Sequence, residues 1–441
     1  MPWQGLARPG GSGEDDVALW TVHGNGRRLV RDAVVASEER LSWPLTIGFG
    51  LQHLLAMFGT TTLVPLLTGF PLTTTLLLSG VGTLLFLLLT RNRVPTYLGA
   101  SVAFVVPLGA AAGEAGASPA ALLGGIVAVG LVVMAVGVAV KALGVRLLES
   151  AMPPVVTGAV VLMIGLSLAP QSVSWFGEQR MPAVLTLGTI VLLTVLSRGM
   201  AGRAAVLIGV LVGWIYAVLT GDLVPERIDE LAAAPWFGLP QLIVPQAHIS
   251  VMPFVLPLVI VLVAEHVAHL KAVAAMSGRD LDPYVGDALI SGGLATTLAG
   301  SAGGSALSSY AANIGVMAAT RVYSTAACLV AAVGAIVLSF SPKLGALINT
   351  IPLGVLGGTT LVLFGLLALV GARVWLDAAV DFADPVNLVV MGTAVIAGVG
   401  NLTLQVGELR ITGLVWGSVG IVLIYPILRS LADARDAATE S

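Results

Sequence analysis

The sequence predicts an all-α polytopic membrane protein of about fourteen transmembrane segments, arranged as two inverted repeats of seven. Three observations predict this fold. Of the 441 residues, 57% are hydrophobic and 10% are charged, and the mean hydropathy is +0.97, which is too apolar for a soluble globule. Apolar runs of about twenty residues, the length that crosses a bilayer as a helix, recur from Pro44 to the C-terminus. The third observation is an internal repeat at an offset of 213 residues.

The apolar runs are separated by short loops that contain Gly, Pro or charged residues. The clear spans are expected at 44–67, 71–90, 119–144, 153–172, 182–198, 203–220, 251–273, 321–341, 349–371, 386–403 and 411–428. Weaker spans are expected at 98–112, 286–302 and 304–319.

Loop charges predict the orientation, because Lys and Arg are enriched on the cytoplasmic side. The N-terminal arm carries Arg27, Arg28, Arg31 and Arg40, whereas the opposite loop 222–231 has four acids and one Arg. Both termini are therefore expected in the cytoplasm, with residues 1–40 and 432–441 as tails and the spans in the inner cell membrane. Residues 1–40 are expected to be partly disordered and lack the features of a signal peptide. Lys343 and Arg410 fall on the wrong side of this assignment.

Several functional classes are excluded by what the sequence lacks. The single Cys328 excludes a disulfide framework or a cysteine metal site, and no Walker-type phosphate loop interrupts the spans. A net charge of −3 without a long basic block argues against nucleic acid as a partner. No nucleophile–base pair or catalytic domain suggests an enzyme. An ion gradient is therefore the expected energy source, with no cofactor.

The internal repeat relates two halves of opposite orientation, because the offset covers seven spans, an odd number. It aligns His53 with His266, and it also pairs Pro44 with Pro257, Gly80 with Gly293, Thr83 with Thr296 and Tyr97 with Tyr310. The weak spans 98–112 and 304–319, which are the third and the tenth in chain order, also correspond. Both are short and interrupted, by Gly99-Ala100-Ser101 in one and by Gly303-Gly304-Ser305 in the other. Broken segments at equivalent positions of two halves point to a midplane binding site.

Glu265 is the prime candidate for that site. It lies inside the apolar run 251–273, where a charge costs about 2.5 to 3.5 kcal/mol and is a functional hypothesis by default. Burial favours the neutral form of a carboxyl, so Glu265 is expected to exchange a proton near physiological pH. His269 follows on the same helical face and is expected to relay or stabilise that proton. His53 and His266 are more often packing or interhelical hydrogen-bond residues than ligands, and Glu265 itself has a purely structural alternative.

Four strings resemble the nucleobase-ascorbate transporter family and are most similar to bacterial uracil permeases. They read QHLLAMFG at 52–59, YLG at 97–99, AEHVAHL at 264–270 and NIGVMAATRVYS at 313–324, and the likeness extends from about Leu41 to Leu431. The resemblance implies fourteen spans, a core domain at 41–150 and 246–342, a gate domain at 151–245 and 343–431, and a homodimer. It also implies proton-coupled nucleobase import, with Glu265 as the substrate-binding acid, His269 beside it and Tyr310 in the pocket.

The chemistry of a uracil-like ring is consistent with these assignments. Its N–H groups suit a carboxylate, and its carbonyls suit backbone N–H groups around Ala103, Phe104, Ala311 and Ala312. Half-helix N-termini offer such donors. Val102 and Thr60 complete the expected substrate-binding set, and Asn313, Ser309 and His266 are expected to support it. As alternatives to a direct role, Tyr310 caps the broken helix through its hydroxyl, and Gly303, Gly304 and Gly315 allow close helix packing.

The chain departs from the family pattern inside the expected pocket. Ala312 stands where uracil permeases have a Glu before the Asn, and Val102 stands where they have a stacking Phe. Ala306 and Leu307 replace a Pro-Asn pair. Three readings follow: a proton-coupled uracil symporter, a transporter of xanthine, another purine or an anion on the same fold, and a relative that binds substrate without transporting it.

Overall fold

The computed structural model describes residues 20–27, 34–145, 153–167, 169–197, 202, 205–406, 409–411 and 413–440. The elements before residue 240 are β1 (Thr21–Val22), β2 (Glu39–Arg40), α1 (Trp43–Thr68), α2 (Leu72–Leu89), β3 (Leu98–Ala100), η1 (Val102–Phe104), α3 (Val105–Glu114), α4 (Pro119–Leu143), α6 (Pro154–Ser167), α7 (Ala169–Glu178), α8 (Arg180–Leu196), α10 (Ala205–Thr220) and α11 (Pro225–Ala233).

The elements after residue 240 begin with a 3₁₀ turn and end with a long C-terminal helix. They are η2 (Ile249–Val251), α12 (Met252–Val255), α13 (Leu258–Ser277), η3 (Asp282–Tyr284), α14 (Val285–Ala302), β4 (Leu307–Ser309), α15 (Ala311–Thr320), α16 (Thr325–Ser339), α17 (Pro342–Asn349), α18 (Leu353–Asp377), α19 (Pro385–Val399), β5 (Leu404–Val406), β6 (Leu409–Ile411) and α20 (Gly413–Glu440).

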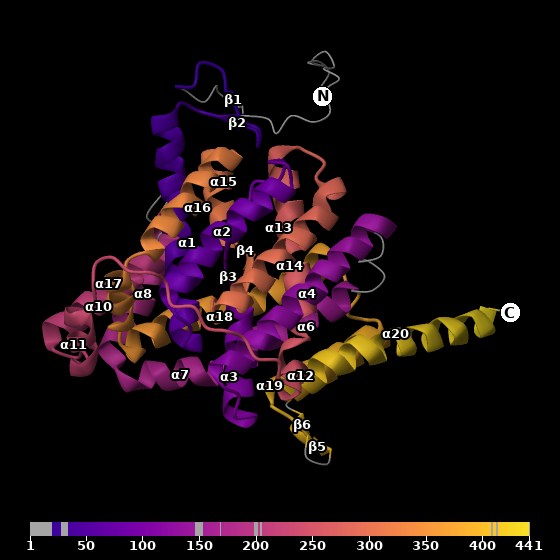
Figure 1. Ribbon diagram of the computed structural model, residues 1–441. Helices are drawn as coiled ribbons and strands as arrows, with labels where there is room; N and C mark the ends of the chain where they lie inside the picture. The colour runs from indigo at the N-terminus through magenta and orange to yellow at the C-terminus, as the bar shows by residue number, and fades with distance from the viewer. Residues whose placement is uncertain are drawn as a thin grey trace.

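The molecule is a helical bundle, as the apolar runs predict. Among the described residues, seven helices are long and apolar enough to cross a membrane, or nine if each of two bent pairs is one span. The bent pairs are α10 with α11, at 106°, and α16 with α17, at 85°. Helices α3, α8 and α19 are apolar but shorter. In Figure 1, β1 and β2 lie at one end of the bundle, and α20 projects away from it.

Helix ends follow the local sequence. Ser118 caps α4 by accepting a hydrogen bond from the Ala121 N–H at 3.3 Å, with Pro119 at the first helical position. The expected span 251–273 is interrupted at Pro257, which has no N–H to continue a helix, so that α12 ends at Val255 and α13 begins at Leu258. Helix α13 then runs on to Ser277, and Gly278 ends it with a φ of 68°.

The two weak segments meet in the centre of the bundle, where Figure 1 shows β3 and β4 among the helices. The strands pair antiparallel, with Leu98 opposite Ser309 and Ala100 opposite Leu307, and both strands are buried. The interruption expected in both segments is present, since each strand is followed by a short helix, α3 or α15. Non-helical backbone at membrane depth is tolerated only where protein or a cavity surrounds it, and this pair lies within protein.

Two details of the sequence prediction are wrong. Tyr97 precedes β3, whereas Tyr310 follows β4, so the two tyrosines are not at equivalent positions of the strands. Hydrogen bonds between the strands fix their register, and this register does not follow the offset of 213 residues that aligns the helices. Gly315 has no atom within 4 Å of an added Cβ, so it does not serve close packing. Gly303 does, because a Cβ there would lie 2.7 Å from the Ile243 nitrogen.

Parts of both expected tails form secondary structure. Within residues 1–40, the described residues 20–27 and 34–40 include β1 and β2, which pair in parallel. Residues 432–440 continue α20 as helix. The remaining residues of the expected N-terminal tail lie outside the described part of the chain.

Candidate functional site

Side chains from α2 and α14 hold the paired strands. Thr83 on α2 accepts a hydrogen bond from the Leu98 N–H at 2.9 Å, and Ser79 donates to the Leu98 carbonyl at 2.5 Å. Thr296 on α14 donates to the Leu307 carbonyl at 2.8 Å. Buried hydroxyls thereby satisfy backbone groups that no helix satisfies. The paired strands β3 and β4, here called the platform, are therefore held by side chains of α2 and α14.

Gly99 allows the strand β3 to pass close to its neighbours. A Cβ at this position would lie 2.7 Å from the Thr61 hydroxyl oxygen and closer still to the ring of Tyr310. The Tyr310 hydroxyl donates to the Ala100 carbonyl at 3.0 Å, and the Tyr310 N–H bonds the Tyr97 carbonyl at 3.1 Å. Tyr310 therefore links the two broken segments. It is the N-cap residue of α15, but its side chain makes no capping hydrogen bond, so the alternative that its hydroxyl caps the helix is wrong.

Glu265 lies on α13 next to this platform. Its carboxyl group is beside the hydroxyls of Ser101, which follows β3, and Ser308, which is in β4. The residue as a whole is half-buried, but its Oε2 atom is inaccessible and makes no hydrogen bond within the described part of the chain. Apart from the Glu265 carboxyl, the buried Ser101 hydroxyl has no partner there. Buried polar groups normally have partners, so Oε2 of Glu265 is open to a polar ligand.

His269 lies one turn further along α13, beside the backbone of Ser309. Its Nδ1 is buried and makes no hydrogen bond among the described residues. His266 instead donates from Nδ1 to the Leu262 carbonyl at 2.8 Å and lies against Gly292 of α14. The structure thus brings Glu265, His269 and Ser309 together and directs the His266 ring toward a neighbouring helix.

Asn313 occupies the first turn of α15 and faces α1. Its side-chain amide donates to Nδ1 of His53 at 3.1 Å and to the His53 carbonyl at 3.2 Å. The expectation that His53 makes an interhelical hydrogen bond is therefore confirmed. Asn313 Oδ1 and Gln52 Oε1 are also buried without a partner in the described region.

The other expected site residues lie in the segments that follow the strands. Ala103 and Phe104 are buried in the main apolar core, and Val102 packs with Ala100 and Phe364. The Phe104 N–H is already bonded to the Ser101 carbonyl at 3.3 Å, which removes it as a free donor. Ala311 and Ala312 form the first turn of α15. The side chains of Thr60, Ala311 and Ala312 lie outside the described residues.

Sequence reasoning did not assign Ser101 or Ser308 to the site. Both serines lie in the strings of small residues that interrupt the two weak segments, and Glu265 is the only acid of the span 251–273. Hydroxyls in both interruptions could therefore have been proposed as partners of that acid. Two cavities, of about 290 and 150 Å³, lie elsewhere. One lies between α19 and α20 and the other between α1, α10 and α17, and both are lined mainly by apolar side chains. Neither lining contains an ionisable side chain, so the candidate site for a polar, proton-linked solute is the Glu265 region.

Comparisons with known proteins identify the family and the fold. Residues 45–407 match the profile of the Permease family (Xan_ur_permease). The chain belongs to the Permease family. It is 45% identical over 412 residues to the putative pyrimidine permease RutG of Escherichia coli K12, covering 91% of this chain and 93% of that protein. It is 38% identical to the uracil permease of Bacillus caldolyticus, covering 88% and 93%.

Solved structures show the same fold at low identity. The transmembrane domain of the cyanobacterial bicarbonate transporter BicA superposes with a TM-score of 0.60 at 15% identity, over 85% of this chain and 96% of that one. Murine Slc26a9, an anion transporter in the inward-facing state, superposes with a TM-score of 0.65 at 13% identity, over 89% and 69%. Family membership and the apolar helices together make this permease a multi-pass membrane protein and a transporter, not an enzyme.

Proposed function

We propose that this permease is a proton-coupled symporter that imports a nucleobase, with uracil as the expected substrate, by alternating access. The observation that carries the proposal is the buried, unpartnered Oε2 of Glu265 at the crossing of β3 and β4. The names of the relatives, a putative pyrimidine permease and several uracil permeases, support the substrate class.

The proposed substrate contacts follow from the chemistry of the ring. Glu265 accepts a hydrogen bond from a ring N–H, and the first N–H groups of α15, at Ala311 and Ala312, donate to the ring carbonyls. Those N–H groups have no partner inside their own helix and lie at the positive end of its dipole. Glu265 also carries the proton, and His269 stabilises it. Neither residue requires a cofactor.

The proposed architecture has fourteen spans in two inverted repeats of seven. Two observations support the repeat. Thr83 and Thr296, which the offset of 213 residues aligns, both bond the first residue of a buried strand, Leu98 or Leu307. The antiparallel pairing of β3 with β4 is what two inverted segments would produce. On this basis residues 41–150 and 246–342 form a core domain, and residues 151–245 and 343–431 form a gate domain.

The cellular setting belongs to the same proposal. Loop charges support cytoplasmic tails at both ends, with residues 1–40 and 432–441 on that side of the inner membrane. A homodimer is the assembly that the family resemblance implies. The proposed partners are the nucleobase, protons and the lipid bilayer, without nucleic acid.

A second candidate is transport of another solute, such as xanthine, a different purine or an anion. The sequence favours it at two positions, because Ala312 and Val102 offer less polar and less aromatic contact than Glu and Phe would. A third candidate binds its solute without transporting it. All three candidates share the fold and differ in their solute and turnover, so one uptake experiment separates them.

The test is radiolabelled uptake into proteoliposomes with an inward proton gradient. The variants are Glu265→Gln, Glu265→Ala and Ala312→Glu, and uracil, xanthine and bicarbonate are assayed in parallel. Gradient-dependent uracil uptake that both Glu265 variants lose supports the symporter. Uracil uptake that is absent in the native chain and appears only in Ala312→Glu would reject uracil as substrate. Binding without uptake of any solute would favour the non-transporting relative.

A further inference from the structure

Residues 34–42, here called the N-terminal strap, run across the ends of two helices that form the candidate site. We propose that the strap positions α13 and α15 relative to each other, through an ion pair between Glu38 and Arg279, and thereby sets the affinity for substrate. This inference rests on the proposed function for its kinetic readout. The positioning itself is a statement about the backbone, and it can be measured without any substrate.

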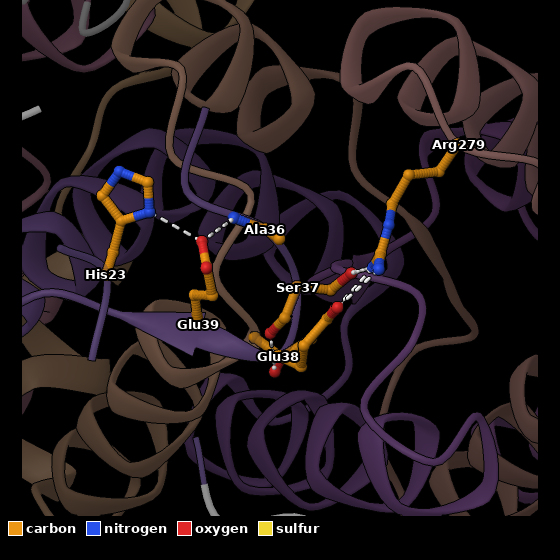
Figure 2. A network of polar contacts seen from close by, with 7 residues as sticks. His23, Ala36, Ser37, Glu38, Glu39 and Arg279 are labelled. Carbon is orange, nitrogen blue, oxygen red and sulfur yellow. Dashed lines mark hydrogen bonds and ion pairs between the residues drawn. The ribbon is translucent and has the colours of Figure 1, made fainter. Parts of the chain in front are cut away.

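Through Ser37 and Glu38, the strap holds the C-terminus of α13. Arg279 follows Gly278, the residue that ends this helix. Its guanidinium donates from Nη1 and Nη2 to the two carboxylate oxygens of Glu38, at 2.5 Å each, and from Nη1 to the Ser37 hydroxyl at 2.9 Å. Figure 2 shows this fork of contacts. Paired, charge-assisted hydrogen bonds fix orientation as well as distance, so the end of α13 cannot rotate freely against the strap.

Through Val35, Ser37 and Glu39, the strap also holds the connection between α15 and α16. The Val35 N–H bonds the Arg321 carbonyl at 3.0 Å, and the Tyr323 N–H bonds the Val35 carbonyl at 2.9 Å. Further along, the Thr325 N–H donates to the Ser37 carbonyl at 3.1 Å, and the Ser324 hydroxyl donates to the Glu39 carbonyl at 2.6 Å. These bonds fasten the chain directly after the last residue of α15.

The strap has its own internal support. Glu39 turns away from Arg279 and accepts hydrogen bonds from the Ala36 N–H at 3.1 Å and from Nδ1 of His23 at 2.7 Å (Figure 2). These contacts close the turn between Val35 and β2. Glu38 and Glu39 therefore have separate roles, since Glu38 reaches out to α13 and Glu39 stabilises the strap itself.

The link matters because α13 and α15 carry opposite halves of the site. Glu265 and His269 are on α13, and the proposed backbone donors are at the start of α15. Helix α15 has ten residues and is about 15 Å long. A tilt of the helix about its C-terminal end, which the strap holds, therefore moves its first turn by a distance that grows with this length. A carboxylate and backbone donors bind one planar ring only if their spacing is correct.

Three other titratable groups lie near this ion pair. Arg93, in the loop after α2, adds a weaker attraction to Glu38, and Tyr284 and Glu39 lie near Arg279. About one third of each paired side chain is exposed, so water weakens the pair. Its removal is therefore expected to loosen the link without unfolding the bundle.

The test compares Glu38→Gln, Arg279→Gln, Arg279→Lys and the charge swap Glu38→Arg with Arg279→Glu. Asp377→Asn is the matched control, because it removes the exposed pair with Arg373 on α18. The readouts are KM and Vmax of uracil uptake, and amide hydrogen exchange over residues 307–320. Both Gln variants are expected to raise KM about three- to tenfold with little change in Vmax, and to speed exchange at the start of α15.

Two further variants separate positioning from folding. Arg279→Lys keeps the charge but loses the fork and should lie between the native chain and Arg279→Gln. The charge swap should recover part of the lost affinity, although Arg93 opposes an Arg at position 38. Unchanged KM, with faster exchange confined to residues 34–42, would overturn the inference. If the native chain takes up no nucleobase, the proposed function fails, and exchange at residues 307–320 alone decides whether the strap positions α15.

Discussion

The side-chain amide of Asn313, on α15, donates to both the ring and the main-chain carbonyl of His53, on α1, 260 residues away in the sequence. Both residues are buried. The contact ties the half-helix that begins at the crossing strands to the first long span of the bundle. This contact also explains why an apolar helix contains a histidine, without giving His53 a role in substrate binding.

Replacing Asn313 by Ala should destabilise the protein by about 0.6 to 1.7 kcal/mol, the range for interhelical hydrogen bonds within a membrane. The His53 carbonyl and ring would keep their burial but lose a donor. Thermal unfolding in detergent measures the effect. A variant as stable as the native chain would show that Asn313 has a purely functional role.

Lys343 is an exception to the loop-charge rule, and the structure explains its place. Its Nζ donates to the carbonyls of Leu231 and Ala232, at the end of α11, at 2.5 and 3.2 Å. Lysine is favourable there because helix C-termini leave carbonyls unpaired and carry partial negative charge. These hydrogen bonds, rather than the loop-charge rule, explain a lysine at position 343. The same contact joins α11 to α17.

Lys343→Met should therefore speed amide exchange in residues 225–235 by about two- to fivefold, since a helix-terminal cation contributes roughly 0.3 to 1 kcal/mol. Lys343→Arg keeps the charge and should show a smaller effect. Exchange mass spectrometry measures both. Equal exchange in the native chain and Lys343→Met would mean that the contact contributes nothing to the stability of α11.

Gly293 on α14 packs directly against α4. A Cβ at position 293 would lie 2.7 Å from the Gly130 carbonyl oxygen, and one at position 130 would lie 2.8 Å from the Gly293 carbonyl oxygen. Backbone atoms on both sides cannot yield without moving a helix. Gly293→Ala should therefore destabilise the protein by about 1 to 3 kcal/mol, the usual effect of overpacking.

Gly365 on α18 is the matched control for that substitution. An added Cβ meets nothing within 4 Å there, so Gly365→Ala should be neutral or stabilising by up to about 1 kcal/mol, because Ala favours helix more than Gly does. Unfolding midpoints of the two variants in the same detergent test the contrast. The packing argument would fail if both variants shifted the midpoint equally.

The pair of Glu38 and Arg279 also predicts a pH dependence. Burial alone would raise the pKa of Glu38, but hydrogen bonds from the Arg279 guanidinium outweigh it and hold the pKa below its usual value of 4.5. A lowered folded-state pKa contributes stability that is present above 4.5 and is lost as the pH falls through the folded-state value. The difference in unfolding midpoint between the native chain and Glu38→Gln should stay constant from pH 5 to 8 and shrink as the pH falls below 4.5.

Any change of uptake between pH 5 and 8 should consequently persist in Glu38→Gln, because the pair stays ionised throughout that range. Uptake measured across this window in both proteins provides the check. Loss of the pH dependence in the variant would instead assign the response to the strap.

The helical class and most span positions could be predicted from the sequence alone. Hydrophobic runs of bilayer length specify helices, since backbone groups in lipid must be satisfied within the segment. The interruptions at 97–104 and 303–310 were also predictable, because Gly and Ser clusters weaken helices locally. Glu265 and His269 could be proposed as site residues, because burying an acid in an apolar run has a high free-energy cost and therefore suggests a function.

Tertiary structure alone decided how these pieces meet. The pairing of β3 with β4, the two serines beside Glu265, the bond from Asn313 to His53 and the fastening of Arg279 by Glu38 all join residues far apart in the chain. Composition and periodicity show whether a segment suits water, lipid or the protein interior. They do not show which residues far away in the sequence it contacts. Those partners depend on packing and on the pairing of every buried polar group, which only the folded chain determines.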